Sequence, residues 1–337
     1  MSFQEAIQRP SGPHLSVVIP MYNEVESAVP MLDSVQSALA TCGMRWELIV
    51  VDDGSTDGTV KVLKSHAAKL GPHIRIIALR RNFRQTAAMQ AGIDHARGDV
   101  IAMLDGDLQN DPADIPKLVH RLLQDDLDLV AGWRAQRQDG WLLRKLPSFL
   151  ANRLIAKVTG LKFQDLGCSL KVFRAPVLKE IRLYGEMHRF IPAWLSTVTS
   201  PDRMAEEPVR HQARQFGQSK YGLSRTLRVL TDLLAIHFFL RFGARPGHFF
   251  GGIGLILGAV GSLVLTYLLT LKLTGESVGG RPLLWMGFFC VIAGLQFLTT
   301  GVLAEILARI YFDGNHARSY HVLPQATVAH PDEAWHG

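Results

Sequence analysis

Short apolar runs alternate with helical patterns in the first part of the chain. The runs are rich in Val, Ile and Leu, and each stops at a polar cluster, as expected of buried parallel strands. They lie at residues 15–19, 46–51, 74–79, 100–104 and 128–131. Residues 26–40 carry a helical pattern, and another helix follows the second run with Thr56 or Asp57 as its N-cap. This alternation predicts an α/β fold with a mostly parallel sheet and helices on both faces.

The last third of the chain has a different pattern, with two long apolar stretches that carry no charge. Residues 249–271 and 283–304 each exceed the ~18 residues that mark a membrane-spanning helix. The link between them is short and rich in glycine, which predicts a transmembrane hairpin. Basic residues flank both ends of the hairpin (Arg241, Arg245, Arg309 and Arg318), against Lys272 and Arg281 near the link. By the positive-inside rule both termini and the N-terminal domain lie in the cytoplasm.

Apolar and basic residues interleave at residues 141–160 and 223–242. Such stripes suit helices in a membrane interface, and packing against a protein core is the alternative. These patterns predict the following segments: a tail (1–14), a cytoplasmic catalytic domain (15–222), a juxtamembrane amphipathic helix (223–246), a two-helix transmembrane hairpin (247–308) and a cytoplasmic tail (309–337). The expected location is therefore the inner membrane.

Composition narrows the class of partner. The 337 residues are 47% hydrophobic and carry a net charge of +6. Without a run of basic residues or a nucleic-acid motif, this charge favours an anionic substrate or a membrane surface over nucleic acid. The polar residues 1–13 are unlike a signal peptide. The three cysteines lack metal-ligand spacing, which argues for reduced thiols.

The run at residues 100–104 ends in Asp105-Gly106-Asp107, with Gln109 close behind. Carboxylate and amide oxygens suit a hard cation such as Mg²⁺, which takes one or two carboxylates together with substrate phosphates. Gly106 keeps the backbone between the acids accessible to a ligand. Acids follow the second and fourth runs and arginines follow the third and fifth, at what should be one edge of the sheet. Both signs of charge suit a metal and a nucleoside diphosphate, although no dinucleotide or Walker phosphate loop is present.

Three ordered motifs carry a resemblance to a known family: VIPMYNE at residues 18–24, VDDGSTDGT at 51–59 and LDGDLQ at 104–109. They resemble the signatures of the GT-A family 2 glycosyltransferases, in particular the polyprenyl-phosphate glycosyltransferases that are similar to dolichol-phosphate mannose synthase. The resemblance covers residues 15–321. It implies a GT-A fold, with Pro20, Tyr22, Glu24, Asp53, Asp105, Gly106 and Gln109 binding the donor. It further implies that Asp105, Asp107 and Gln109 serve Mg²⁺ or Mn²⁺.

Two later segments sharpen the subgroup. Residues 163–174 (FQDLGCSLKVFR) resemble the acceptor side of the family, where the aspartate matching Asp165 faces the reaction centre. Residues 214–222 (RQFGQSKYG) resemble its basic loop, whose arginine and lysine hold phosphates. The resemblance thus implies a catalytic set of Asp107, Asp165, Arg214 and Lys220. Arg84 and Phe149 depart from the family pattern, so the acceptor phosphate is assigned to Arg134, Arg144 and Ser219.

The activity that the resemblance implies is an inverting, metal-dependent transfer of a hexosyl group. The donor is a nucleoside-diphosphate sugar, with UDP favoured, and the acceptor is undecaprenyl phosphate in the cytoplasmic leaflet. The resemblance also fits a homo-oligomer, such as a tetramer. Neither the sugar nor the polyprenyl chain length follows from the sequence.

Four other interpretations of the sequence remain open. One is a GDP-mannose-dependent polyprenyl-phosphate mannosyltransferase, and another is a catalytically silent scaffold that binds lipid or nucleotide. A processive synthase lacks support because Arg45-Trp46 is preceded by Cys42 where a Gln-x-x-Arg-Trp motif has glutamine. A nucleotidyltransferase would need a glycine-rich basic loop near the N-terminus, and residues 21–27 are unlike one.

Overall fold

The computed structural model describes residues 14–134, 161, 163–212, 238, 242 and 246–313. Contacts divide the chain into two compact units, residues 1–233 with 318–337, and residues 234–317. Both expected interface helices lie outside the described residues, apart from Phe238 and Phe242 in the second.

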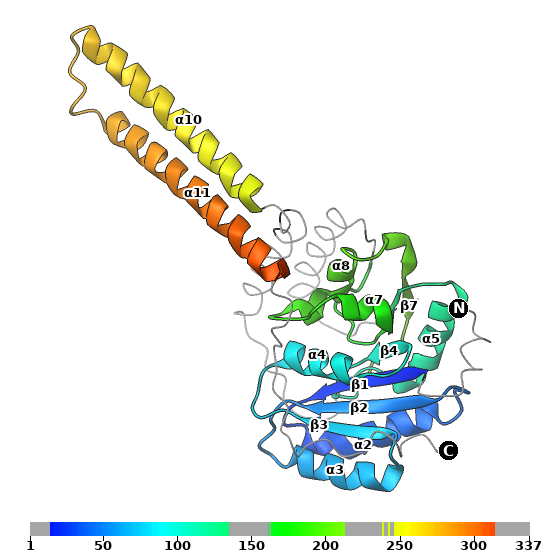
Figure 1. Ribbon diagram of the computed structural model, residues 1–337. Helices are drawn as coiled ribbons and strands as arrows, with labels where there is room; N and C mark the ends of the chain where they lie inside the picture. Colours follow the sequence, from blue (N-terminus) through cyan, green and yellow to red (C-terminus); the bar gives the residue numbers. More distant parts are fainter. Residues whose placement is uncertain are drawn as a thin grey trace. The chain divides into compact units, whose positions relative to one another are not determined.

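A seven-stranded sheet forms the centre of the first unit, with strand order β3-β2-β1-β4-β6-β5-β7 (Figure 1). The strands are Leu15–Met21 (β1), Trp46–Asp52 (β2), Ile74–Ala78 (β3), Val100–Met103 (β4), Leu129–Trp133 (β5), Lys171–Arg174 (β6) and Met204–Pro208 (β7). Strand β6 is antiparallel to β4 and β5, whereas the other pairings of this sheet are parallel. The mostly parallel sheet expected from the sequence is confirmed.

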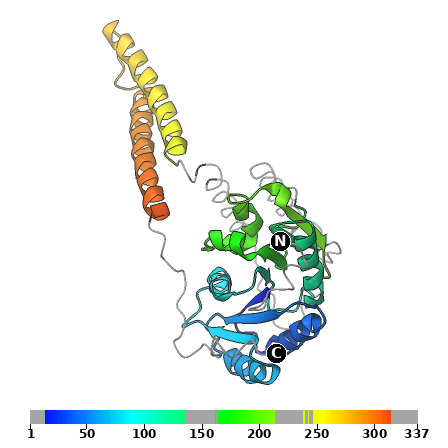
Figure 2. The ribbon, with the colours of Figure 1, turned by 45° about the vertical axis from the view of Figure 1, so that its right-hand side comes forward.

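Helices cover both faces of the sheet, as predicted. The longer ones are Val25–Leu39 (α2), Thr59–Leu70 (α3), Gln85–His95 (α4) and Ile115–Gln124 (α5). Shorter ones are Pro112–Asp114 (η1), Ala175–Glu180 (α7), Met187–Phe190 (η2), Ile191–Leu195 (α8) and Pro201–Arg203 (η3). Strand residues alternate between two apolar clusters: Val17 packs in the cluster that includes α2, α3 and α5, and Val18 packs in the one that includes α4, α7 and α8. Figure 2 shows α4 on one side of the sheet and α2 and α3 on the other.

Helix α3 begins differently from the prediction. Its N-cap is Gly58, with a φ of 94°, rather than Thr56 or Asp57. Asp57 still satisfies the first turn, because its carboxylate accepts hydrogen bonds from the backbone N–H and the hydroxyl of Thr59. Its other oxygen accepts from the backbone N–H of Val25 at 3.2 Å. The aspartate therefore joins the starts of α2 and α3 instead of capping one helix.

The strand directions place the polar clusters at one edge. Strands β1 to β4 are mutually parallel, and β5 has the same direction because two antiparallel pairings through β6 relate it to β4. Ligands bind beyond the carboxyl ends of strands in open α/β sheets. The loops that follow these strands are therefore where a site is expected.

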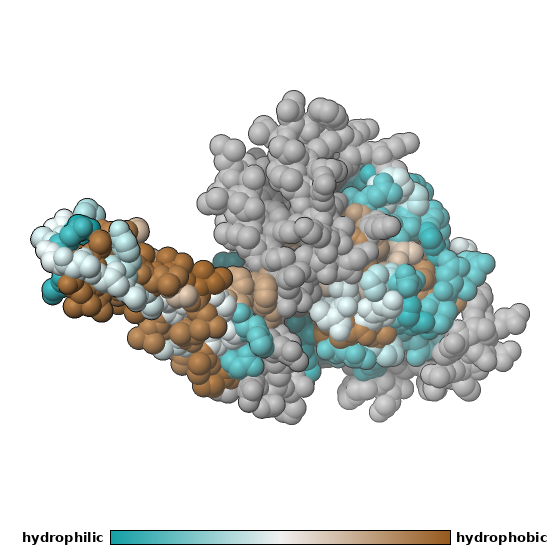
Figure 3. Space-filling view, turned by 90° about the horizontal axis from the view of Figure 1, so that it is seen from above, coloured by the Kyte–Doolittle hydropathy of each residue, from teal (hydrophilic) through white to brown (hydrophobic). Residues whose placement is uncertain are grey.

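The second unit contains two long helices, Pro246–Leu273 (α10) and Pro282–Asp313 (α11). Both are long and apolar enough to cross a membrane. With 28 residues, α10 is about 42 Å long at 1.5 Å per residue, against a hydrocarbon core of about 30 Å. Most large apolar side chains of this hairpin are exposed, and Figure 3 shows apolar residues along its length and more polar residues at one end. The two expected apolar helices are confirmed.

Glycines bring α10 and α11 close together. A Cβ on Gly254 would lie 2.7 Å from the carbonyl oxygen of Gly294, and one on Gly294 would lie 2.7 Å from the backbone nitrogen of Gly258. Small residues allow such approach between membrane helices. At the start of α10, the backbone N–H of Gly247 donates a hydrogen bond to a carboxylate oxygen of Glu305 in α11 at 3.3 Å. The hairpin is therefore packed backbone against backbone.

Candidate active site

The loops after β1 and β2 are bonded to each other. Asn23, at a positive φ of 52°, donates its backbone N–H to the hydroxyl of Ser55 at 2.8 Å. Its side-chain oxygen accepts from the backbone N–H of Thr56, also at 2.8 Å. Glu24 donates its backbone N–H to the hydroxyl of Thr59. Much of the DGSTDGT motif thus acts to hold the β1 loop in shape, which leaves Tyr22 exposed beside the strand ends.

Asp53 is buried where the β2 and β3 loops meet. Its side chain accepts a hydrogen bond from the backbone N–H of Phe83 at 2.7 Å, and the residue is 3% exposed. Burial raises the pKa of this carboxyl to about 6, although hydrogen bonds from the N–H groups of Phe83 and Arg84 act in the opposite direction. Gly54 sits directly against the backbone of Arg81, since a Cβ there would be 2.4 Å from the Arg81 carbonyl carbon. The loops after β2 and β3 are therefore packed directly against each other.

The two acids after β4 have different surroundings. An Oδ of Asp105 accepts a hydrogen bond from the side-chain amide of Gln85 at 2.6 Å, and its backbone N–H points to the hydroxyl of Ser169. Burial, and next the negative charge of Asp107, raise the pKa of Asp105 to about 6. Asp107 accepts a hydrogen bond from the backbone N–H of Gln109. At the carboxyl end of β4, the negative charge of one carboxylate therefore makes ionisation of the other less favourable.

A cavity of about 420 Å³, here called the central cavity, lies over these strand ends. Its lining includes seven residues predicted from the sequence: Pro20, Tyr22, Glu24, Asp53, Asp105, Gly106 and Asp107. Asn82, Arg84 and Gln85 complete its polar lining. Gln109 is outside this lining, and its backbone oxygen instead accepts a hydrogen bond from the N–H of Gln212. The structure thus brings three separate motifs to one space large enough for a ligand.

Asp165 is engaged in a buried ion pair. Both its carboxylate oxygens accept from the guanidinium of Arg134, with Nε–Oδ2 at 2.6 Å and Nη2–Oδ1 at 2.8 Å. The carboxylate of Glu206 accepts the backbone N–H groups of Gln164 and Asp165. Such a bidentate pair orients both side chains strongly. The structure shows Asp165 and Arg134 as partners. The role of Asp165 in catalysis and that of Arg134 at the acceptor phosphate stay predictions.

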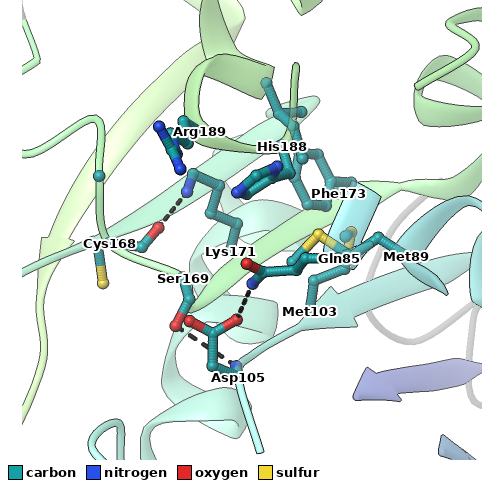
Figure 4. A pocket seen from close by; sticks show the side chains of 12 residues that line it. Gln85, Met89, Met103, Asp105, Cys168, Ser169, Lys171, Phe173, His188 and Arg189 are labelled. Atoms are coloured by element: carbon teal, nitrogen blue, oxygen red, sulfur yellow. Dashed lines mark hydrogen bonds between the residues drawn. The ribbon is translucent and has the colours of Figure 1, made fainter. Parts of the chain in front are cut away.

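A smaller cavity of about 150 Å³, here called the lateral cavity, shares Gln85 and Asp105 with the central one. Figure 4 shows Lys171, His188 and Arg189 around it, with Asp105 at the opposite side. Lys171 is 3% exposed and donates to the carbonyl oxygen of Cys168. Burial lowers the pKa of its ammonium group. The site residues predicted from the sequence did not include Lys171, His188 or Arg189.

A signal for Lys171 does exist in the sequence. It is a charged residue within the apolar segment Leu170-Lys171-Val172-Phe173, which indicates a lysine on a buried strand. His188 and Arg189 give no such signal, because their positions depend on how η2 packs. The Thr86 hydroxyl lies 2.6 Å from both the Gly185 oxygen and the His188 Nδ1, which ties that segment to α4.

Four of the predicted site residues, Arg144, Arg214, Ser219 and Lys220, lie outside the described residues. The segment before Arg214 is described. His211 pairs with Asn110 in a β-bridge, and Gln212 donates its N–H to the Gln109 oxygen at 2.8 Å. The chain therefore enters residues 213–222 from a point bonded to the acidic loop.

The residues present fit a divalent cation. Among the described residues, no group of three or more His, Cys, Asp or Glu side chains forms a complete metal site. Asp105 and Asp107 nonetheless place two mutually repelling carboxylates in the central cavity. Hard oxygen ligands of this number suit Mg²⁺ or Mn²⁺ when substrate phosphates supply further oxygens.

Known proteins are similar to the chain over most of its length. The family model described as "Glycosyl transferase family 2" matches residues 16–182. A "Dodecaprenyl-phosphate galacturonate synthase" from Rhizobium johnstonii is 51% identical over 307 residues, which are 91% of each chain. An "Undecaprenyl-phosphate 4-deoxy-4-formamido-L-arabinose transferase" from Edwardsiella ictaluri is 35% identical over 320 residues, which are 95% of this chain and 96% of the relative.

Solved structures share the fold. A glucosyl-3-phosphoglycerate synthase from Mycobacterium tuberculosis, in complex with Mn²⁺ and UDP-glucose, aligns with a TM-score of 0.54 at 18% identity. The alignment covers 71% of this chain and 83% of that one. A mannosyl-3-phosphoglycerate synthase from Rubrobacter xylanophilus aligns with a TM-score of 0.53 at 16% identity, over 70% and 77% of the two chains. At this identity the likeness concerns the fold alone.

Proposed function

The chain belongs to glycosyl transferase family 2 and is a polyprenyl-phosphate glycosyltransferase, and from this premise we propose that it transfers a hexosyl group from a UDP-sugar to a polyprenyl phosphate with inversion at C1. The observation that carries the proposal is the central cavity, where residues from the ends of β1, β2 and β4 line one space. An extended ligand with a base at one end and a diphosphate at the other matches this arrangement.

The donor's nucleoside lies against the β1 and β2 loops. Tyr22 offers an exposed ring for stacking, while Glu24 and Asp53 offer carboxylates to hydroxyl and N–H groups of the ribose and base. The diphosphate then lies over Gly106, where no side chain stands between the two acids. A solved neighbour of the same fold holds UDP-glucose, and UDP is the nucleotide proposed for this chain.

Asp105 and Asp107 would hold Mg²⁺ or Mn²⁺, with Gln109 next to them in sequence. When bound, such an ion neutralises charge on the departing nucleoside diphosphate, which can contribute several kcal/mol to the rate. Gln85 restrains the Asp105 carboxylate through its 2.6 Å hydrogen bond and so limits that oxygen to one orientation.

The acceptor is largely ionised at neutral pH, because the second pKa of a phosphate monoester is about 6. A phosphate oxygen forms a bond to C1 while the bond from C1 to the diphosphate breaks, and UDP leaves with that electron pair. No proton must be removed from the doubly ionised acceptor. The protein's task is therefore to position the two phosphates and offset their repulsion. Arg134, Arg144, Arg214, Ser219 and Lys220 are the proposed phosphate contacts, and Asp165 positions Arg134.

The apolar hairpin explains how the enzyme meets a lipid. A polyprenyl chain stays in the bilayer, and α10 and α11 are long and apolar enough to span one. We place residues 247–308 in the inner membrane and the catalytic domain, residues 15–222, with both termini on the cytoplasmic side. A homo-oligomer, such as a tetramer, completes the proposal.

A donor panel tests this function. Purified full-length protein in detergent is incubated with undecaprenyl or dodecaprenyl phosphate, Mn²⁺ or Mg²⁺, and one radiolabelled donor. The donors are UDP-galacturonate, suggested by the name of the relative with 51% identity, UDP-glucose, UDP-N-acetylglucosamine and GDP-mannose. Label from a UDP-sugar is expected in the organic phase.

The other outcomes separate the alternatives. Transfer from GDP-mannose alone would support the mannosyltransferase reading. Metal-dependent binding of a donor without transfer would contradict the proposed acceptor. Absence of binding by every donor would favour a catalytically silent scaffold.

A further inference from the structure

The lateral cavity lies at the sugar end of the proposed donor site. The central cavity is lined by Tyr22 and Asp53, the proposed nucleoside residues, and also by Gln85 and Asp105. These two residues also line the lateral cavity. A donor with its diphosphate over residues 105–107 therefore has its sugar close to the two residues that the cavities share. What lines the lateral cavity should decide which sugar substituents are accepted.

Two cationic side chains line this cavity. Lys171 is buried in β6, and the acceptor seen for its ammonium group is the neutral carbonyl of Cys168. An ammonium group has three N–H donors, so two remain for other acceptors. Arg189 lies on η2, with its Nη2 at 3.0 Å from a carboxylate oxygen of Glu186 and 24% of its side chain exposed. Figure 4 shows the ends of both side chains on the side of the cavity away from Asp105.

The acids near these cations already have partners, and Glu186 is the partner of Arg189. Asp165 is held bidentately by Arg134, and Asp105 accepts from Gln85 and would serve the metal. Burying a cation beside an empty polar space is costly unless an anion compensates it. An anionic group on the ligand that accepts from the Lys171 ammonium group would offset this cost.

We infer that the lateral cavity selects a donor whose sugar carries a carboxylate, that is, a nucleoside-diphosphate hexuronic acid, with Arg189 and Lys171 receiving the C6 carboxylate. This inference rests on the proposed function, because it assumes that the donor's diphosphate lies at Asp105 and Asp107. The planar fork of arginine matches a carboxylate, and the bonds from Thr86 to Gly185 and His188 hold the Arg189 segment in place.

The test compares UDP-galacturonate with UDP-galactose, which differ only in a carboxylate or a hydroxymethyl group at C6. Calorimetry in the presence of Mn²⁺ gives the affinity of the full-length protein for each donor and for UDP. Transfer to undecaprenyl phosphate gives kcat/KM for each. The wild-type protein is expected to prefer the uronate by about 100-fold or more, as a site built for a polar group rejects the analogue that lacks it.

Arg189→Gln is the informative variant, since Arg189 is partly exposed and its loss leaves β6 intact. It should lose most of the preference for UDP-galacturonate while its affinity for UDP and for UDP-galactose stays within about threefold of wild type. Arg189→Lys should recover part of the preference. Glu186→Gln is the matched control: it removes the same ion pair but keeps Arg189, so the preference should remain.

Distinct outcomes separate this inference from the proposed function. Equal affinity of the wild type for the two donors, or an equal loss of both in Arg189→Gln, would overturn the inference even if lipid is glycosylated. Loss of preference in Glu186→Gln to the same extent as in Arg189→Gln would also overturn it, because the ion pair alone would then matter. A preference in binding without any transfer to lipid would support the inference and contradict the proposed function.

Discussion

Asp105 borders both cavities, and its neighbour Asp107 borders the central one alone. The side-chain amide of Gln85 donates a hydrogen bond to the carboxylate of Asp105, whereas Asp107 lines the larger cavity and accepts from the backbone N–H of Gln109. Of the two, Asp107 is therefore the better position for testing the metal assignment, because its replacement disturbs fewer contacts in the fold.

Asp107→Asn should lower kcat/KM for lipid glycosylation by about 100-fold or more, because an interaction with developing charge is lost. The midpoint of thermal unfolding and the amount of protein in the membrane should stay near wild type. Asp125→Asn makes the same chemical change at a surface position paired with Arg121 and should leave turnover unchanged. Wild-type turnover in Asp107→Asn would refute the metal assignment.

Asp53 should make nucleoside binding depend on pH. Its pKa is about 6 in the folded protein against an ordinary 3.8. The folded state therefore binds this proton more tightly than the unfolded state does. The stability that this proton contributes to the fold is present at low pH and is lost as the pH rises through about 6. Uridine binding has the opposite dependence, because an ionised carboxylate is the better acceptor.

Uridine affinity, measured in EDTA so that no metal contributes, should be highest above pH 7 and fall as the pH drops below about 6. Asp53→Asn should bind uridine more weakly and without this dependence on pH. A wild-type affinity that is constant between pH 5 and 8 would show that Asp53 does not act as the ionised acceptor.

Among the secondary-structure elements, those with a strong local pattern were predicted correctly. The five apolar runs became β1 to β5 with ends shifted by at most two residues. Strands β6 and β7 were missed: β6 has four residues, and β7 (MAEEP) contains two glutamates and a proline. Their place is set by pairing with distant strands, and β6 lies between β4 and β5. Local propensity carries little information about such strands.

The same reason explains which site residues could be predicted. Pro20, Tyr22, Asp53 and Asp105 lie at or directly after strands that the sequence indicates, so parallel pairing alone brings them together. Lys171 reaches the site because β6 is inserted antiparallel beside β4, with Met103 opposite Lys171. Arg189 depends on a short helical turn that is held by Thr86 and Gln90 of α4. Neither arrangement is visible in local sequence.

The packing of the β2 loop against the β3 loop makes Gly54 critical. Gly43 and Gly54 have similar positive φ values, 69° and 71°, but a Cβ on Gly43 would meet nothing within 4 Å. Gly43→Ala should therefore cost only the conformational strain, about 1–2 kcal/mol. Gly54→Ala should cost more and weaken UDP binding, because its Cβ would collide with the Arg81 backbone. Thermal unfolding and UDP affinity, measured side by side, check this difference; equal effects would contradict it.

For the whole molecule, the distribution of charge predicts its orientation in the membrane. Arg281 in the link between α10 and α11 is paired with Glu276, which reduces the positive charge there. At the outer ends of the hairpin, four basic residues (Arg241, Arg245, Arg309 and Arg318) stand against two near the link (Lys272 and Arg281). The positive-inside rule therefore places the link on the outer face and the catalytic domain inside.

Labelling with a membrane-impermeant maleimide tests this topology in a protein that lacks Cys42 and Cys290. Gly279→Cys, in the link, should react in spheroplasts with intact membranes. Ser65→Cys, on the exposed surface of α3, should react only after the membrane is opened. The reverse pattern would overturn the orientation. Reaction of both in intact spheroplasts would contradict a sealed hairpin.

We expect the hydrogen bond from Gln212 to Gln109 to couple the proposed donor site to the proposed acceptor site. Arg214 is two residues beyond Gln212, and Asp107 is two residues before Gln109. A rearrangement of the acidic loop around an incoming diphosphate should therefore reach Gln212, two residues before Arg214. We expect a compulsory order, with the sugar nucleotide bound before the lipid and UDP released last. UDP should then be a competitive inhibitor against the sugar nucleotide and a noncompetitive one against the lipid; competition with the lipid would exclude this order.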